Sequence, residues 1–282
     1  MVNLNYQLIG GNAMTIKMIA TDMDGTFLDG DSAFNRPRFQ QLLNEMAAQQ
    51  VKFVVASGNQ YPHLPPYFDG LTGEITYLAE DGAHIVLAGE AISEDVIPAA
   101  TLQQFLNWLP TTPLFASAWV ILSGQQASYT EMLPNSKRFK ASHYFYGDMQ
   151  HVPDLREVTD GIYKIDITWA QFDVSAQEQL VNATFPGELR ATSSGLGGID
   201  VVLPHVNKAY GLAKLQAKWG ITRDETLAFG DSGNDLEMLA MAKYGYAMAN
   251  APENVRQAVD YVTPLDNDHD GVLDVIAQYL NV

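Results

Sequence analysis

Cysteine is absent from the sequence of 282 residues, which excludes disulfides, thiolate metal sites and cysteine nucleophiles. Basic residues are scarce: 16 lysines and arginines stand against 33 aspartates and glutamates, and the formal charge is -17. A charge of this sign repels polyanions, so we expect no nucleic-acid partner. No apolar run approaches the roughly 20 residues that cross a bilayer, and the N-terminus has no basic region followed by a hydrophobic segment. These absences favour a cytoplasmic protein that does not bind membranes.

The apolar content of the chain is sufficient for a sizeable folded core. Hydrophobic residues make up 47% of the sequence and charged residues 17%, which is unlike the composition of a disordered chain. At about 150 residues per domain, the length favours one or two domains, and two is our working number. Residues 1–13 show no clear period and are expected to be either a mobile extension or the result of a misassigned start. The oligomeric state leaves no signature in the sequence.

Residues 16–57 have the pattern of a strand, a helix and a second strand. The run IKMIATD is apolar and rich in β-formers, as in a buried parallel strand. Asn35 is placed to cap a helix with Pro37 in its first turn. An apolar face of this helix repeats at Phe39, Leu42, Leu43 and Met46. The second strand, VKFVVAS, follows directly, so the pattern predicts the α/β class with loops at the C-terminal ends of the strands.

Regular alternation of strands and helices stops after the DGA turn that follows the third strand. The next hundred residues mix amphipathic stretches, proline-interrupted loops and strand candidates such as GIYKIDITWA. Alternation returns with the strand-like runs IDVVLP and ETLAFGD and with helices over 209–219 and 235–241. We therefore predict a discontinuous α/β core, residues 14–88 and 194–282, with an inserted α+β domain at 89–193.

The motif DMDGT stands where the first strand runs into a loop. Asp22 and Asp24 are two positions apart, so both side chains face one site. Two carboxylates so placed divide the work of phosphoryl transfer, since one attacks phosphorus while the other moves protons. Gly25 allows a tight turn that a side chain would obstruct. The competing interpretation is a pair of acidic turn residues that only close a strand.

Three further segments begin where strands end or helices start. In ASGN, the Ser57 hydroxyl and the glycine N–H suit a phosphoryl oxygen, although Ser-Gly after a strand is also a common helix cap. Lys208 opens a helix and would offset the repulsion between carboxylates and an incoming phosphate. The motif GDSGND adds Asp231 and Asp235 to the acidic group. Carboxylates gathered at strand ends repel one another unless a cation lies among them, so we infer a magnesium site.

Together these segments resemble the haloacid dehalogenase-like hydrolases, because DMDGT, Ser57, Lys208 and GDSGND occur in that family's order and on the expected elements. The insert resembles the class IIB cap of the Cof-type branch, and ASGNQY and GDSGNDLEMLA are similar to segments of a bacterial sugar phosphatase of that branch. The resemblance covers the chain from about Met14 onward. It implies a Rossmann-like doubly wound parallel sheet with an inserted α+β cap. The implied activity is a magnesium-dependent phosphatase for small phosphorylated metabolites, above all sugar phosphates.

The resemblance also implies a role for each matching residue. Asp22 would be the nucleophile that becomes aspartyl phosphate, and Asp24 would be the acid for the leaving alkoxide and then the base for water. Magnesium would be held by Asp22, Asp231 and the backbone carbonyl of Asp24, with Asp235 in support. The phosphoryl group would be bound by Ser57, Gly58, Lys208 and Asn234.

One position departs from the family pattern. Many Cof-type members have arginine directly after the Ser-Gly pair, whereas this chain has Asn59. Asn59 is still expected to bind phosphate, but a neutral amide compensates less charge, so substrate choice does not carry over from the arginine-bearing members. Three alternatives stay open: phosphoryl transfer to a sugar acceptor, hydrolysis of flavin or pyridoxal phosphates, and a non-catalytic sensor of phosphorylated metabolites.

Two weaker patterns are set aside. The segment DNDHDG at 266–271 matches the first half of a calcium-binding loop, but the twelfth position is Ala277, where a glutamate is required. Asp270 is therefore interpreted as the cap of the last helix. His63 follows ASGN closely and is interpreted as a residue of a helix surface in preference to a residue of the pocket.

Overall fold

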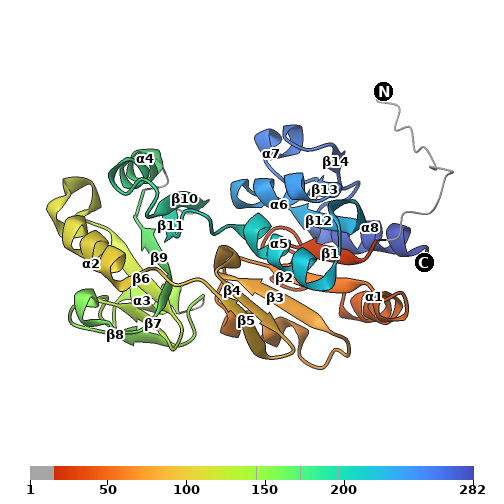
Figure 1. Cartoon of the computed structure of the whole chain (residues 1–282), viewed down its shortest axis with the longest axis horizontal. Helices are drawn as coiled ribbons and strands as arrows, with labels where there is room; N and C mark the ends of the chain where they lie inside the picture. Colours follow the sequence, from red (N-terminus) through yellow and green to blue (C-terminus); the bar gives the residue numbers. More distant parts are fainter. Residues whose placement is uncertain (1–15, 144, 172, 196) are drawn as a thin grey trace.

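The structure, a computed structural model, describes residues 16–143, 145–171, 173–195 and 197–282. The predicted extension at residues 1–13 lies outside these ranges. The described chain forms two lobes, with the first and last parts of the sequence together in one lobe and the middle part in the other (Figure 1). Within the described ranges, no helix has the length and apolar character needed to cross a membrane.

The larger lobe, which we call the core, is built on one eight-stranded sheet. Its strand order is β14-β13-β12-β1-β2-β3-β4-β5, and the strands from β14 to β3 run parallel, while β4 and β5 are antiparallel to their neighbours. The strands are β1 (Met18–Thr21), β2 (Lys52–Ala56), β3 (Ile75–Ala79), β4 (His84–Leu87), β5 (Glu90–Glu94), β12 (Thr226–Gly230), β13 (Tyr244–Ala247) and β14 (Tyr261–Val262). The central strands are apolar because both of their faces are covered.

Helices cover both faces of the core sheet, with α1, α7 and α8 on one face and α5 and α6 on the other. Their bounds are α1 (Arg36–Ala48), α5 (Lys208–Trp219), α6 (Leu236–Met241), α7 (Glu253–Gln257) and α8 (Gly271–Leu280). In β1, Ile19 packs with the first group, and Met18 and Ala20 pack with the second, because successive side chains point to opposite faces. This arrangement confirms the predicted doubly wound α/β fold.

Helix α1 begins and packs as the sequence predicts. The Asn35 side chain accepts a hydrogen bond from Arg38 N at 3.3 Å, and Pro37 lies in the first turn. The buried residues of the helix are Phe39, Leu42, Leu43 and Met46. This apolar face joins one hydrophobic cluster with α8 and the sheet.

The smaller lobe, which we call the cap, has six strands in the order β10-β11-β9-β6-β7-β8, antiparallel except for the pair β7 and β8. The strands are β6 (Trp119–Gly124), β7 (Ser128–Thr130), β8 (Met149–His151), β9 (Ile162–Thr168), β10 (Arg190–Gly195) and β11 (Gly198–Val202), and the helices are α2 (Ala99–Trp108), α3 (Lys137–Ser142) and α4 (Ser175–Thr184). Helices α2 and α4 pack on the apolar face of this sheet. The cap is thus an α+β unit.

Strand membership corrects the predicted domain boundaries. The predicted boundary between residues 88 and 89 assigns β5 to the insert, but β5 pairs with β4 at the edge of the core sheet. The run IDVV, predicted to resume the core, forms β11 and pairs with β9 and β10 in the cap. An apolar run has the same pattern in either sheet, so periodicity does not reveal which sheet receives it. We propose that the chain crosses between the lobes at 95–98 and 203–207.

Helix α5 lies very close to the turn that follows β3. A Cβ atom at Gly82, whose φ is +103°, would overlap the backbone oxygen of Asn207, the residue before Lys208. From the helix side, a Cβ atom at Gly211 would lie 2.6 Å from Leu78 Cδ1. The two glycines therefore fix the approach of α5 to the sheet and, with it, the position of Lys208.

Gly82→Ala should lower the melting temperature by several degrees more than Gly70→Ala. Both glycines have positive φ, +103° and +79°, so both substitutions carry a backbone cost of about 1–2 kcal/mol. A Cβ atom at Gly70 meets nothing within 4 Å, so only Gly82→Ala adds the overlap, which costs about 1–3 kcal/mol more. Thermal unfolding measures the difference, and equal melting temperatures of the two variants would contradict the close contact.

Candidate active site

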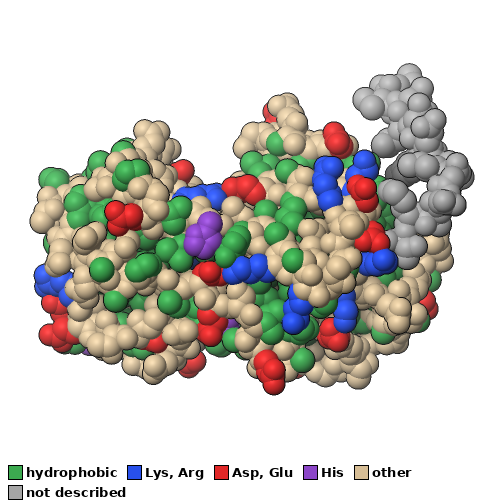
Figure 2. Space-filling view, in the orientation of Figure 1, with side chains coloured by type: hydrophobic (Ala, Val, Ile, Leu, Met, Phe, Trp, Pro, Cys, Tyr) green, Lys and Arg blue, Asp and Glu red, His purple; other side chains and the backbone are tan. Residues whose placement is uncertain are grey.

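Three loops at the C-terminal ends of neighbouring strands form the floor of a cavity. Strands β12, β1 and β2 are adjacent and parallel, so their C-terminal ends meet at one edge of the sheet. Asp231 follows β12, Asp22 follows β1 and Ser57 follows β2. All three residues line a cavity of about 570 Å³ whose other wall comes from the cap. In the space-filling view a notch separates the lobes, and charged side chains gather along their boundary (Figure 2).

Lys208 lies at the centre of the charged groups in this floor. Its Nζ donates hydrogen bonds to Asp22 Oδ1 and Asp235 Oδ1, both at 2.6 Å, and the residue is 1% exposed. Burial lowers the pKa of Lys208, but Asp22 and Asp235 raise this pKa by more, so the ammonium keeps its charge. The lysine therefore holds two buried carboxylates in fixed positions.

Asp235 uses both of its carboxylate oxygens inside the protein. Oδ1 accepts from Lys208, and Oδ2 accepts from the backbone N–H groups of Asp231 and Ser232, both at 3.0 Å. Asp22 and Asp231 are among the described residues that line the cavity, whereas Asp235 is not. Asp235 thus orients the loop after β12 and the lysine.

The acidic groups of the floor have the chemistry of a divalent-cation site. Asp22, Asp231 and Asp235 each offer one carboxylate oxygen, and these oxygens lie within 4.8 Å of one another. Burial raises the pKa of Asp22 well above its usual value, against the opposing effect of Lys208. Burial and the charge of Asp235 raise the pKa of Asp231 to about 6, although Thr26 Oγ1 donates to Asp231 Oδ1 at 3.0 Å. Three carboxylates share one lysine, so a further cation would relieve their repulsion.

Asp24 is exposed in the same cavity and contacts Asn59. Asn59 Nδ2 donates a hydrogen bond to Asp24 Oδ2 at 2.8 Å, and both residues line the cavity. The amide thus fixes one carboxylate oxygen, and Oδ1 has no hydrogen-bond partner among the described residues. The phosphate-binding role of Asn59 stays a prediction, and its contact with Asp24 is a feature that the sequence does not indicate.

The turn after β3 supports the loop that carries Ser57. Glu80 and Asp81 have left-handed φ angles of +52° and +55°, which residues with side chains rarely adopt. Glu80 N donates to Asn59 O, and Asp81 N donates to Ser57 O, both at 3.1 Å. These hydrogen bonds help to offset a conformational cost of about 1–3 kcal/mol per residue. The two loops therefore form one rigid wall of the site.

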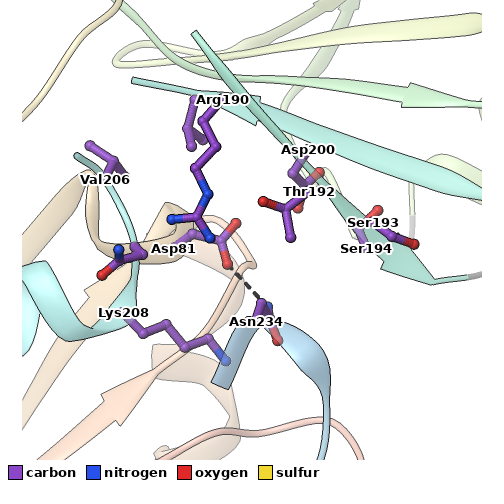
Figure 3. A pocket seen from close by; sticks show the side chains of 11 residues that line it. Asp81, Arg190, Thr192, Ser193, Ser194, Asp200, Val206, Lys208 and Asn234 are labelled. Atoms are coloured by element: carbon purple, nitrogen blue, oxygen red, sulfur yellow. Dashed lines mark hydrogen bonds between the residues drawn. The ribbon is translucent and has the colours of Figure 1, made fainter. Parts of the chain in front are cut away.

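Asp81 also orients Asn234, a role that sequence analysis missed. Asn234 Nδ2 donates to Asp81 Oδ1 at 3.2 Å, and Figure 3 shows the two side chains directed at each other near Lys208. Asn234 Oδ1 accepts a hydrogen bond from Ser232 Oγ at 2.6 Å. The sequence presents Asp81 only as part of a turn, because its partner stands 153 positions further along the chain. Only the fold brings the two residues together.

Comparison with known proteins identifies the family. Residues 19–276 match the family model of the haloacid dehalogenase-like hydrolases. The chain belongs to this family. It is 33% identical over 267 residues to the Escherichia coli 5-amino-6-(5-phospho-D-ribitylamino)uracil phosphatase YbjI, and the match covers 95% of this chain and 97% of the relative.

Two solved structures have the same fold as this chain. SMU.1108c from Streptococcus mutans has a TM-score of 0.88 at 33% identity, over 95% of this chain and 100% of that chain. BT1666 from Bacteroides thetaiotaomicron, described among the phosphatases of the superfamily, has a TM-score of 0.81 at 25% identity, over 98% of this chain and 100% of that chain. The fold and the family are therefore those that the motifs indicate.

In this haloacid dehalogenase-like hydrolase, the cap wall of the cavity consists of residues that sequence analysis does not select. They are Ile121, Arg138, Ala141, Ser142, Phe145, Tyr146, Lys164, Asp166, Thr168, Ser194, Gly198 and Asp200. The string GIYKIDITWA does show alternating polar and apolar residues, which is the one available signal. It does not indicate that the polar face of this strand looks toward the active site.

Two residues outside the cavity test further expectations. His63 lies half-buried in a one-turn helix, with Nε2 3.3 Å from the Tyr67 hydroxyl, and it is not among the described residues that line the cavity. Asp270 occupies the N-cap position of α8, as the sequence predicts, but its side chain makes no capping hydrogen bond. Its carboxylate accepts hydrogen bonds from Asn35 and Arg38 instead of a helix N–H, because α1 packs beside it.

Asp231→Asn should stabilise the metal-free protein at neutral pH. The pKa of Asp231 is raised to about 6 in the folded state, so the folded protein binds the proton more tightly than the unfolded chain. The stability that protonation supplies is present at low pH and is lost as the pH rises from about 4 to 6. In excess chelator, the melting temperature of the variant should exceed that of the wild type at pH 7.5. This difference should shrink as the pH falls toward 4, and a pH-independent difference would contradict the raised pKa.

Proposed function

We propose that this protein is a magnesium-dependent phosphatase of small phosphorylated metabolites, above all sugar phosphates, that acts through an aspartyl phosphate at Asp22. The observation that carries the proposal is the buried Asp22 carboxylate, which Lys208 holds at the floor of a cavity that also exposes Asp24. A nucleophile fixed next to a second carboxyl group that is open to the substrate is the arrangement that two-step phosphoryl transfer requires. Relatives that are named as phosphatases support this proposal.

In the proposed reaction, the two carboxyl groups have separate tasks. Lys208 holds Oδ1 of Asp22, so Oδ2 would attack phosphorus while the bond from phosphorus to the leaving-group oxygen breaks. Asp24 would give its proton to the departing alkoxide. It would then take a proton from the water that attacks the aspartyl phosphate, which releases phosphate and restores Asp22. The phosphoryl oxygens would be bound by Ser57, Gly58, Lys208 and Asn234.

The donor set of the floor fits magnesium, a cation that prefers oxygen ligands. Asp22, Asp231 and the backbone carbonyl of Asp24 would hold the ion, and Asp235 would orient them through Lys208 and the backbone. The raised pKa values of Asp22 and Asp231 support the assignment, because a cation would favour the charged form of each carboxylate. When bound, the ion supplies positive charge that offsets the charge of the phosphoryl oxygens.

One phosphorylated metabolite is the first to test. YbjI, which aligns with nearly the whole chain, is named for the hydrolysis of 5-amino-6-(5-phospho-D-ribitylamino)uracil. That compound carries its phosphate on a sugar-alcohol chain, so it is related to the sugar phosphates proposed here. Phosphate release from it should be compared with release from sugar, flavin and pyridoxal phosphates.

Chelation should stop phosphate release, and added magnesium should restore it. Calcium should substitute poorly, because it prefers more ligands and longer bonds.

Asp22→Asn should abolish turnover while keeping the fold, since the amide is nearly isosteric but a poor nucleophile. Asp31→Asn, at an exposed position after the same loop, is the matched control and should keep full activity. Full turnover in excess chelator would contradict the metal, and substantial turnover by Asp22→Asn would remove Asp22 from the mechanism.

Asp24→Asn should impair hydrolysis most where the leaving group is poor. A sugar hydroxyl needs a proton to depart, whereas an activated phenolate leaves without much help, so phosphorylation of Asp22 by a phenolic phosphate should survive better. The second step still needs a base. Stopped-flow measurement with a phenolic phosphate should therefore show a burst followed by slow turnover. An equal loss on phenolic and sugar phosphates without a burst would assign Asp24 to the metal or to the loop.

A further inference from the structure

Alternation along β9 places charged residues on the cavity face of the cap. Ile165 and Ile167 pack into the apolar cluster beneath α2 and α4. Lys164, Asp166 and Thr168 point to the opposite face and line the cavity that contains Asp22 and Asp24. Charged side chains on an enclosed face of a sheet cost free energy unless they are paired. These residues are therefore expected to interact with groups outside the sheet.

The neighbouring strand adds a second carboxylate directly opposite the first. Asp200 of β11 pairs in register with Asp166 of β9, and the two strands are antiparallel. Asp200 is 9% exposed and also lines the cavity. In Figure 3 it lies on the cap strand beside the core loops that carry Asp81 and Asn234. Like charges directly opposite each other on adjacent strands are destabilising, more so when water is largely excluded.

Groups within the protein satisfy these two carboxylates only in part. Asp166 accepts hydrogen bonds from the Tyr146 hydroxyl at 3.0 Å and from Thr168 Oγ1 at 2.8 Å, and both donors are neutral. Lys164 Nζ lies 3.3 Å from Asp200 Oδ2, while Asp200 Oδ1 is enclosed and has no hydrogen-bond partner among the described residues. Burial raises the pKa of Asp200, and the charge of Asp166 adds to this effect against Lys164.

The charge of Lys164 is shared among several acceptors. Its Nζ donates to the backbone oxygen of Gly58 at 2.5 Å and lies 3.5 Å from Glu80 Oε2 and 3.9 Å from Asp81 Oδ2. One cation therefore serves three carboxylates at the boundary of the lobes, counting Asp200. This wall of the cavity remains rich in hydrogen-bond acceptors and would favour a ligand that brings donors.

We propose that Asp166, with Asp200 opposite it, accepts hydrogen bonds from hydroxyl groups of the leaving group, so that the enzyme selects phosphate monoesters of polyhydroxylated compounds. This inference rests on the proposed phosphatase function and identifies Asp166 as the residue that recognises the leaving group. Asp166 is the accessible member of the pair, since it is partly exposed to the cavity while Asp200 is buried. A leaving group without hydroxyl donors gains nothing from this wall, and an anionic one is repelled by it.

Arg138 would favour the opposite selectivity, for an anionic leaving group, so the two residues can be distinguished by experiment. Its guanidinium lies 4.9 Å from the Trp119 ring centroid, and the side chain lines the same cavity. Its Nε is enclosed without a hydrogen-bond partner in the described part of the chain. If Arg138 rather than Asp166 dominates recognition, substrates with a carboxylate on the leaving group are preferred.

The test compares Asp166→Asn with the wild type on ribitol 5-phosphate, 3-phosphoglycerate and p-nitrophenyl phosphate. We expect kcat/KM for ribitol 5-phosphate to fall by about 10- to 100-fold, because a charged acceptor of a substrate hydroxyl is lost. Activity on p-nitrophenyl phosphate, which has no hydroxyl to read, should change less than about 3-fold. Asp148→Asn, at an exposed position elsewhere in the cap, should change neither. Wild-type preference for 3-phosphoglycerate that Arg138→Met abolishes would overturn the proposal.

A deoxy series separates recognition from a general effect on the fold. Ribose 5-phosphate and 2-deoxyribose 5-phosphate, together with the mono-deoxy derivatives of ribitol 5-phosphate, are assayed with both proteins. For at least one derivative, removal of the hydroxyl should lower kcat/KM of the wild type. The same removal should leave kcat/KM of Asp166→Asn unchanged, because the acceptor of that hydroxyl is already lost. Independent losses throughout the series, or an equal loss on p-nitrophenyl phosphate, would overturn the role of Asp166. Absence of hydrolysis of every substrate by the wild type would instead contradict the proposed phosphatase function.

Discussion

The hydrogen bonds from Lys208 to Asp22 and Asp235 are the interaction on which the rest of the site depends. A buried ammonium is costly unless anions surround it, and two buried carboxylates are costly without a cation, so each group requires the others. The geometry is enforced from two directions. Gly82 and Gly211 allow α5 to approach the sheet, and the second oxygen of Asp235 binds the backbone of the loop after β12. The nucleophile proposed at Asp22 is therefore held by packing as well as by charge.

A second buried lysine interacts with several acceptors at the boundary between the lobes. Lys164 of the cap donates to Gly58 O, in the loop proposed to bind the phosphoryl group, and lies near carboxylates of both lobes. Contact between cap and phosphate-binding loop is thus direct, and it brings the polar face of β9 over the floor. The cavity is consequently acidic on both walls, and Lys164 and Lys208 are held by specific partners. A substrate would add to this balance a phosphoryl group at one end and, as proposed, hydroxyl donors at the other.

The core fold and the floor of the site were largely predictable from the sequence, and the cap wall was not. Asp22, Ser57 and Asp231 follow apolar strand runs, and parallel strands bring their C-terminal ends to one edge, so local patterns sufficed. Strand β11 shows the limit, because an apolar run fits the core sheet or the cap sheet equally well. The register of Asp166 with Asp200 and the contact of Asn59 with Asp24 depend on distant pairings that no local period encodes.

The most direct test of this account is to trap the covalent intermediate and locate its phosphate. Asp24→Asn protein is mixed with a phenolic phosphate and magnesium, quenched in acid and digested, and the phosphorylated peptide is sequenced by mass spectrometry. Because the second step lacks its base, the intermediate should accumulate, with phosphate on Asp22 and no label when Asp22→Asn is added. Phosphate on another residue, or label that persists in the double variant, would contradict the assignment of Asp22 as the nucleophile held by Lys208.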